Sequence, residues 1–314
     1  MRLQNSNFHF MRKSMALLLL AISVFYNQVG FGQSNSRNRG TWTATIKDDK
    51  VKIRFYGNDG EGFANTPFLL NELSGIPKKQ KDDFKITREA GIVLFNGNFT
   101  GNEGSGSYVF TPSKEYTAYM NSKGVKDLDE NDLLDFFQIN ITRDYVQMLI
   151  NNGYESPTKK DLIPLAALNI DEAYIRAWKQ NGYSAIKLSD FIPLKSMRVT
   201  EEYLKGFNDI GYTNISVSNL VSLKAVGVTP EYVKDLQGLG FTNIPLSQLI
   251  SLKSLRITAE YIKGFQELGF KGFKLSEIIS LKSMGITTDY VSSMQKKGLN
   301  YDRLDKYIQL KSIK

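Results

Sequence analysis

One pattern recurs seven times in register between Pro112 and Lys314, with a period of twenty-nine positions, the interval from Tyr203 to Tyr232. Its most regular positions are a tyrosine and a glycine that follows eight residues later. The tyrosines are Tyr116, Tyr145, Tyr174, Tyr203, Tyr232, Tyr261 and Tyr290, and the glycines are Gly124, Gly153, Gly182, Gly211, Gly240, Gly269 and Gly298. A fixed period of this kind indicates a repeat protein, in which each unit buries its apolar face against its neighbours.

Each repeat is predicted to hold two short helices, each opened by a side-chain oxygen that caps the N-terminus. The expected caps of the first helix are Ser113, Thr142, Asp171, Thr200, Thr229, Thr258 and Thr287. Those of the second are Ser189, Ser218, Ser247, Ser276 and Asp305. The second helix ends at Asn140, Asn169, Gly227 or Gly285, residue types that accept a positive φ, whereas Arg198 and Arg256 hold that place in two other repeats. Since helices of about ten residues are marginal alone in water, residues 112–314 are expected to form an α-solenoid.

The preceding segment, residues 41–111, has the two-residue periodicity of strands. Apolar residues alternate with polar ones around Trp42 and again around Ile53, with Asp48 and Asp49 as a two-residue turn between them. We expect five or six antiparallel strands with one packed face, preceded by a flexible lead at residues 34–40. The predicted class is therefore α+β, a small antiparallel β domain followed by an all-α solenoid of seven two-helix repeats.

A glycine-rich stretch in the β domain permits two interpretations. Gly97, Gly101, Gly104 and Gly106 could belong to a phosphate-binding loop, or they could serve bulges and turns of a twisted sheet. The stretch lacks the Gly-Lys-Ser/Thr ending of a phosphate loop and does not lead into a helix. The sheet interpretation is favoured, and no cofactor is expected.

The N-terminus has the features of an export signal at residues 1–33. Arg12 and Lys13 precede an apolar run from Met15 to Tyr26, and the small residues Gly30 and Gly32 follow at a possible cleavage site. The apolar run is too short to span a bilayer, so no transmembrane segment is expected in the mature chain. These features predict a protein exported to the periplasm or the extracellular space.

The residue types available for catalysis are few. The chain has no cysteine and a single histidine, His9, which lies in the predicted signal. This excludes His-dependent and Cys-dependent nucleophile systems and the usual zinc sites from the mature chain, so neither a metal site nor a catalytic residue is expected. The alternative is a carboxylate-dependent enzyme acting on envelope glycans, which needs two acids about 5–10 Å apart, and no pair is singled out by the sequence.

Charge is uneven along the repeats. Residues 112–194 hold nine basic and twelve acidic residues, whereas residues 195–314 hold seventeen basic and eleven acidic ones. In the basic half, one lysine recurs at the same place of each repeat, and we name Lys195, Lys224, Lys253, Lys282 and Lys311 the lysine row. The row is either a solvated helix edge or a basic stripe for an acidic polymer or protein surface. The candidate binding residues are Lys195, Lys224, Lys253 and Lys282, supported by Arg198 and Arg256.

The tyrosine of each repeat likewise has two interpretations. It can fill the core while its hydroxyl reaches a backbone partner, or it can form an aromatic strip that binds sugars or peptides. The core interpretation is favoured.

The turn at Gly227-Val-Thr-Pro resembles the helix-hairpin-helix of DNA-binding proteins, but it differs at both glycines of that motif. Thr229 stands at the second, and Arg198 or Arg256 replaces the first in other repeats. No nucleic-acid partner is expected.

The segment from Leu223 to Phe241, with the pattern Leu-Lys-x-x-Gly-Val-Thr-x-Glu-Tyr-Val-Lys-x-Leu-x-x-x-Gly-Phe, resembles a short helical repeat of exported bacterial proteins. It is also similar to repeats attached to some membrane-bound metallopeptidases of the antirepressor type, whose peptidase signature is missing here. The resemblance covers residues 112–314, and residues 41–111 resemble the sheet segment that precedes such repeats. It implies an extracytoplasmic sensing or binding module, and the expected function is a non-enzymatic binding or scaffold protein of the bacterial envelope.

Overall fold

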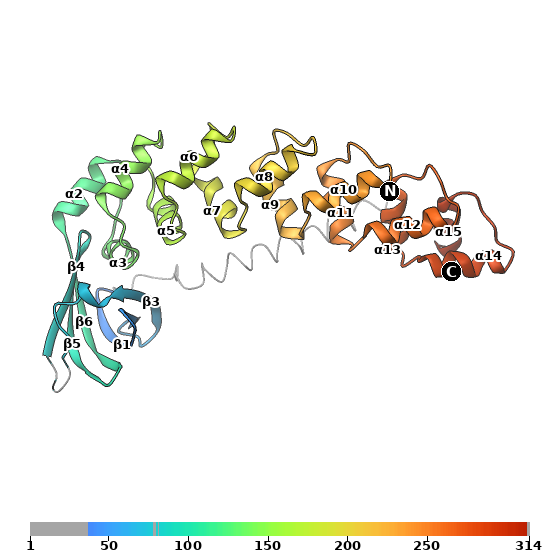
Figure 1. Ribbon diagram of the computed structural model, residues 1–314. Coiled ribbons are helices and arrows are strands. Elements are labelled where there is room, and N and C mark those ends of the chain that lie inside the picture. The colour runs from blue at the N-terminus through green and yellow to red at the C-terminus, as the bar shows by residue number, and fades with distance from the viewer. Residues whose placement is uncertain (1–36, 78–79, 81, 313–314) are drawn as a thin grey trace. The chain divides into compact units, whose positions relative to one another are not determined.

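The computed structural model describes residues 37–77, 80 and 82–312. Among these residues, six strands are followed by fourteen helices, which confirms the predicted α+β class (Figure 1). The chain divides into two compact units, one ending at Arg176 and the other beginning at Ala177. The predicted export signal at residues 1–33 lies outside the described residues.

The strands form one antiparallel sheet in the order β3-β2-β1-β6-β5-β4. Their bounds are β1 (Arg39–Lys47), β2 (Lys50–Tyr56), β3 (Gly62–Leu69), β4 (Asp82–Arg88), β5 (Gly91–Thr100) and β6 (Glu103–Pro112). The predicted turn joins β1 to β2, and Asp48 takes the left-handed conformation there with a φ of 56°. Alternation places Trp42, Ile53 and Phe95 on the buried face, as the two-residue period requires.

The two edges of the sheet are joined by the segment after β3, which contains the short 3-10 helix η1 (Leu70–Glu72). Leu73 pairs with Ile86 of the opposite edge strand, and the backbone N–H of Ser74 donates to the carbonyl of Lys85 at 3.0 Å. The sheet therefore curls around its own aromatic core, where Trp42 lies 5.4 Å from Phe84 between ring centroids. This closure also leaves fewer backbone groups unpaired at the edges.

The glycine-rich stretch belongs to the β5–β6 hairpin, in agreement with the sheet interpretation. Gly101 lies in the turn with a φ of 62°. Gly97 pairs with Gly106 under the ring of Trp42, and a Cβ on Gly97 would lie 2.7 Å from that ring. These glycines make room for a tryptophan in a twisted sheet rather than for a phosphate.

The predicted flexible lead at residues 34–40 is too long at its C-terminal end. Arg39 and Gly40 already belong to β1, and the backbone N–H of Arg37 donates to Asn131 at 2.8 Å. The guanidinium of Arg37 forms an ion pair with the buried Asp135 at 3.0 Å. Partners far away in the sequence hold these polar residues in place. Amino-acid composition gives no information about such partners.

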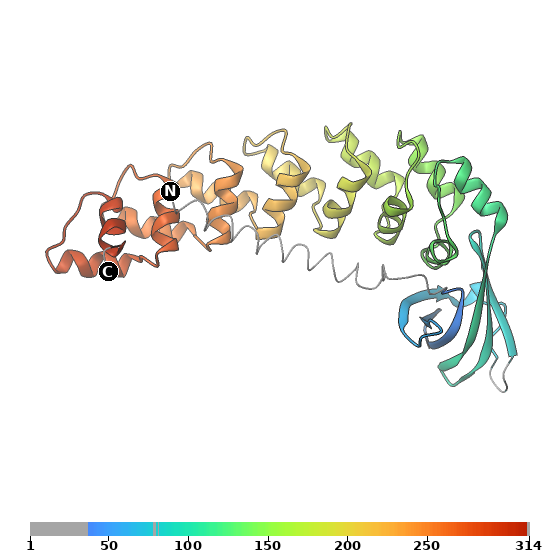
Figure 2. The same ribbon diagram turned by 180° about the vertical axis from the view of Figure 1, so that it is seen from behind.

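The repeats contribute two helices each. Their bounds are α2 (Lys114–Ser122), α3 (Glu130–Ile139), α4 (Arg143–Asn151), α5 (Lys159–Ala167), α6 (Glu172–Gln180), α7 (Leu188–Ser196), α8 (Glu201–Asn208), α9 (Val217–Val226), α10 (Pro230–Gly238), α11 (Leu246–Ser254), α12 (Ala259–Glu267), α13 (Leu275–Ser283), α14 (Thr288–Lys296) and α15 (Leu304–Ser312). Within the second unit, the first helices α8, α10, α12 and α14 pack in one row, and the second helices α7, α9, α11, α13 and α15 pack in another (Figures 1 and 2). No helix in the described part of the chain is long and apolar enough to cross a membrane.

All seven predicted caps of the first helix are confirmed. In each repeat the cap oxygen accepts the backbone N–H of the tyrosine three residues later, for example Thr229 from Tyr232 at 3.2 Å. The other pairs are Ser113–Tyr116, Thr142–Tyr145, Asp171–Tyr174, Thr200–Tyr203, Thr258–Tyr261 and Thr287–Tyr290. The hydroxyl or carboxylate thus satisfies a helix donor that would otherwise have no partner.

The predicted caps of the second helix are wrong. Ser189, Ser218, Ser247, Ser276 and Asp305 lie at the second helical position, because each helix begins one residue earlier at an apolar residue. In two of these five helices an acid inside the first turn does part of the capping, since Asp190 accepts the backbone N–H of Lys187 at 3.2 Å and Glu277 that of Lys274 at 2.8 Å. Carboxylates three residues into the helix are half of a capping box, and the prediction overlooked them.

Candidate functional site

The tyrosines connect successive repeats. The hydroxyl of Tyr232 donates to the carbonyl of Ile257, the first residue of the next repeat, at 2.8 Å. The same bond joins Tyr116 to Ile141, Tyr145 to Ile170, Tyr203 to Val228 and Tyr261 to Ile286, at 2.5 to 3.0 Å. Burial raises the pKa of Tyr232 to about 12 and that of Tyr261 to about 12, so both hydroxyls stay protonated donors at neutral pH. The geometry supports the core interpretation of the tyrosines over a sugar-binding strip.

The lysine row covers the faces of these rings. The Nζ atoms of Lys224, Lys253, Lys282 and Lys311 lie 4.4 to 4.7 Å from the ring centroids of Tyr203, Tyr232, Tyr261 and Tyr290. All four lysines are half-buried, and so is Lys195 at the equivalent place in α7. A cation over a tyrosine face is held by the ring quadrupole, a contact worth about 0.5–1 kcal/mol at an exposed site. The row is therefore more ordered than the solvated edge that the sequence allowed.

The ammonium groups of Lys224, Lys253, Lys282 and Lys311 have no carboxylate partner among the described residues. Other lysines do form ion pairs, for example Lys159 with Asp132 and Lys263 with Glu267. These four charges are consequently held in place without being neutralised by a neighbouring acid.

Acids recur at the start of the first helices, as Glu202, Glu231 and Glu260 in the first turns of α8, α10 and α12. Their pKa values are lowered first by hydrogen bonds from their own backbone and then by the hydroxyl of the capping threonine. The cations that add to the effect are Lys234 for Glu231 and Lys263 for Glu260, not members of the lysine row. The capping threonine and the helix N-terminus thus account for these acids.

Arg198 and Arg256 lie two residues after the last residue of α7 and of α11 and take the left-handed conformation, with φ of 52° and 55°. Asn140, Asn169, Gly227 and Gly285 take it at the same place in other repeats. For a residue with a Cβ this conformation costs about 1–2 kcal/mol, whereas a cation at an exposed helix C-terminus contributes about 0.3–1 kcal/mol. Both arginines are exposed, and neither guanidinium has a hydrogen bond or ion pair to a described residue. Contacts within the described chain therefore do not compensate for their backbone conformation.

The arginines lie beside the lysine row. A Cβ on Gly227 would lie 4.0 Å from the Cε of Lys253, one repeat later. One repeat before and one repeat after, the same two places hold Arg198 with Lys224 and Arg256 with Lys282. By this equivalence, we expect each arginine to lie near a lysine of the row.

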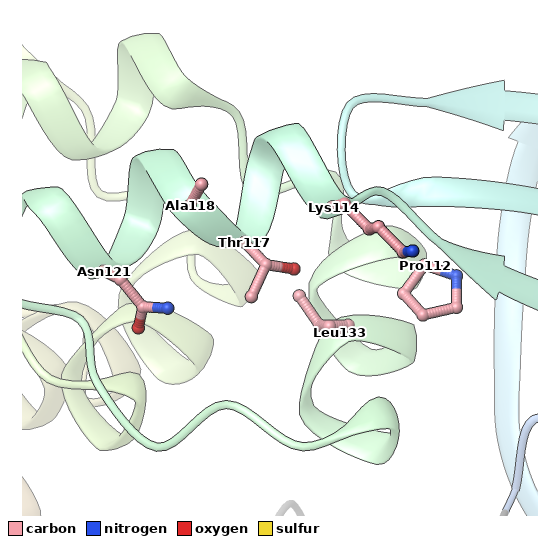
Figure 3. Close-up of a pocket in the computed structure, with 6 residues that line it drawn as sticks. All are labelled: Pro112, Lys114, Thr117, Ala118, Asn121 and Leu133. Carbon is pink, nitrogen blue, oxygen red and sulfur yellow. The ribbon is translucent and has the colours of Figure 1, made fainter.

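A shallow hollow of about 310 Å³ lies between α2 and α3, where Thr117 and Leu133 face each other (Figure 3). Lys114 is the ionisable residue among those that line it. The hollow offers neither paired acids nor a nucleophile with a base, so it does not provide the carboxylate pair that hydrolysis of a glycan requires.

Sequence reasoning missed one member of the site and the contact that orders it. The sequence places Lys311 in the row but leaves it out of the candidate binding residues, which stop at Lys282, and the pattern alone does not indicate the stacking of lysine on tyrosine. The available signal was the constant separation between the tyrosine and the lysine of the following helix, as from Tyr203 to Lys224 and from Tyr290 to Lys311.

No group of His, Cys, Asp or Glu residues within the described ranges could hold a metal ion. No family model, no curated protein and no solved structure matches the chain.

Proposed function

We propose that this chain is a non-enzymatic binding or scaffold module, exported to the bacterial envelope, that binds an acidic polymer or acidic protein surface along the lysine row. The observation that carries the proposal is that the ammonium groups of Lys224, Lys253, Lys282 and Lys311 are fixed over tyrosine faces, with no carboxylate partner among the described residues. A row already ordered in the free protein loses little side-chain entropy on binding, which favours affinity.

The net charge agrees with this assignment. The repeats from residue 195 onward hold the excess of basic residues, and the lysine row lies within them. Like charges in a line attract a polyanion over a distance of roughly one Debye length, about 8–10 Å at moderate salt. An export signal at residues 1–33 would place this surface outside the cytoplasm, where acidic envelope polymers are its natural partners and nucleic acids are not.

The test uses the full chain and a panel of soluble polyanions: hyaluronate, polygalacturonate, polyphosphate and poly-glutamate. In the row variant, Lys195, Lys224, Lys253 and Lys282 are changed to glutamine, which removes the charges and keeps most of each stem. At least one polyanion should bind the unchanged chain, and the row variant should bind it at least about fourfold more weakly, since four exposed charge pairs contribute about 0.2–1 kcal/mol each, or about 0.8–4 kcal/mol together.

The matched control changes Lys205, Lys234, Lys263 and Lys296, which lie on the first helices, to glutamine. It removes the same charge and should keep the affinity within about twofold, a change of less than about 0.5 kcal/mol in binding free energy, because these lysines do not belong to the row. If both variants weaken binding equally, net charge explains the attraction and the row is not the site. If no polyanion binds even at low ionic strength, the proposed function is wrong.

A further inference from the structure

Arg198 and Arg256 differ from the residues that share their place in other repeats. Asn140, Asn169, Gly227 and Gly285 are types that tolerate the left-handed conformation, and an arginine gains nothing from it. Strained residues that no internal contact explains are concentrated at ligand sites, because the function of the side chain offsets the backbone cost.

The arginines occur in the same part of the repeat array as the lysine row. Phe137 and Ala166 stand at the lysine position of the first two repeats, and those repeats end in asparagine. The strained arginines occur where the row is present, each followed one repeat later by a lysine that is held over a tyrosine. By equivalence with Gly227 and Lys253, whose built Cβ and Cε lie 4.0 Å apart, each arginine is expected beside its lysine as a second cation.

The two sites have a defined separation. Arg198 and Arg256 are two repeats apart, with Lys253 of the row between their two lysines. Second helices of neighbouring repeats pack directly on each other, α9 on α11 and α11 on α13. Packed helices lie about 8–10 Å apart, so the cations of the row recur at about that interval.

This interval limits the kind of polyanion that can match the row. Phosphates along one nucleic-acid strand recur about every 3.4 Å, so most of them would fall between the cations. In a linear polysaccharide with one carboxylate per disaccharide, the acidic groups recur at an interval comparable to one repeat. The planar guanidinium suits the two oxygens of a carboxylate, and a neighbouring ammonium adds charge.

We propose that Arg198 with Lys224, and Arg256 with Lys282, are two carboxylate-binding pairs for a linear acidic polysaccharide that carries one carboxylate per disaccharide. This inference rests on the proposed function, because it names the ligand class of the same surface. In this proposal the two arginines determine which polymer binds. The remaining lysines of the row supply electrostatic attraction that depends less on the spacing of the carboxylates.

The test replaces both arginines with glycine, the residue type of Gly227 and Gly285 at the same place in other repeats. In the variant Arg198→Gly/Arg256→Gly, relief of backbone strain should raise the Tm by about 2–4 °C. Its affinity for hyaluronate, which has one carboxylate per disaccharide, should fall about tenfold, as expected for loss of charge-assisted hydrogen bonds. The affinity for polygalacturonate, with one carboxylate per sugar, should be lower from the start and should change less.

Two matched variants separate strain from binding. Asn140→Gly/Asn169→Gly alters the same backbone place in repeats without the lysine row and should leave hyaluronate affinity unchanged. Gly227→Arg adds a third pair next to Lys253, so it should lower the Tm and raise hyaluronate affinity.

The outcomes are distinguishable. If the arginine variant keeps its hyaluronate affinity, or if every polymer binds in proportion to its charge density, the inference is overturned while the proposed function stands. Tightest binding of poly-glutamate would point to an acidic protein and would likewise overturn it. Absence of binding to all polymers would instead contradict the proposed function.

Discussion

At the residue scale, the repeat tyrosine at position 232 contacts three parts of the structure. Tyr232 donates its backbone N–H to the cap Thr229, lies with its ring under Lys253, and donates its hydroxyl to Ile257 of the next repeat. The cap was predictable because capping acts over three residues, and a backbone partner for the hydroxyl was predictable because a buried hydroxyl needs one. The lysine contact was not, because its partners lie on different helices and depend on how those helices pack.

Replacement of Tyr232 tests this structural role. Tyr232→Ala should lower the free energy of unfolding by about 3–5 kcal/mol through the cavity it leaves, and Tyr232→Phe by about 1 kcal/mol through the lost hydrogen bond. Hydrogen exchange should show residues 200–257 opening first, because coupling in a repeat array is local. A Tyr232→Ala protein that unfolds like the unchanged chain, yet loses its ligand, would show that the tyrosines bind ligand directly.

At the element scale, the sheet and the first repeat are joined through Arg88 at the end of β4. Its guanidinium contacts both oxygens of Glu72 in η1 at 2.8 and 3.1 Å. It also donates to the carbonyls of Phe137 and Gln138 at the C-terminus of α3, at 2.7 and 2.9 Å. A single cation thus satisfies the end of a helix and holds it against the strand. Composition and periodicity contain no sign of this joint, since its partners are far apart in the chain.

Loss of Arg88 should therefore destabilise the first unit selectively. Arg88→Ala leaves Glu72 half-buried without its cation and should lower the free energy of unfolding by about 3 kcal/mol. Denaturant unfolding followed by Trp42 fluorescence in the sheet measures this directly. A change below about 0.5 kcal/mol, the usual size for an exposed site, would mean that the joint contributes little.

The stabilisation from the contact between Arg88 and Glu72 should also depend on pH. Burial alone would raise the pKa of Glu72, but the hydrogen bond from Arg88, the backbone N–H of Leu69 and the Arg88 charge together lower it below the ordinary 4.5. Because the folded pKa is the lower one, the stabilisation is present above pH 4.5 and is lost as the pH falls through the folded value. In Glu72→Gln this acid-dependent loss, followed by denaturant unfolding at a series of pH values, should be smaller.

At the scale of the whole molecule, the sequence predicted the repeat register, an antiparallel sheet of five or six strands and the fold class, because each depends on residue periodicities that do not require knowledge of distant contacts. It was wrong about the start of the second helices and about the lead before β1. Those features depend on a single acid in a first turn, such as Asp190, or on distant partners, such as Asp135 for Arg37. The position of the lysine row followed from the repeat alone, whereas its ordering over the tyrosines required the packed helices.

If the lysine row binds an acidic partner, the affinity should depend on ionic strength through the row lysines, and this dependence is the most direct test. The affinity of the full chain for hyaluronate is measured from low to moderate salt for the unchanged protein, the row variant and the control that alters the first-helix lysines. The account predicts a steep loss of affinity with salt for the unchanged chain and the control, and a much shallower loss for the row variant, because the screened charges have been removed. Equal salt slopes for the row variant and the unchanged chain would contradict it.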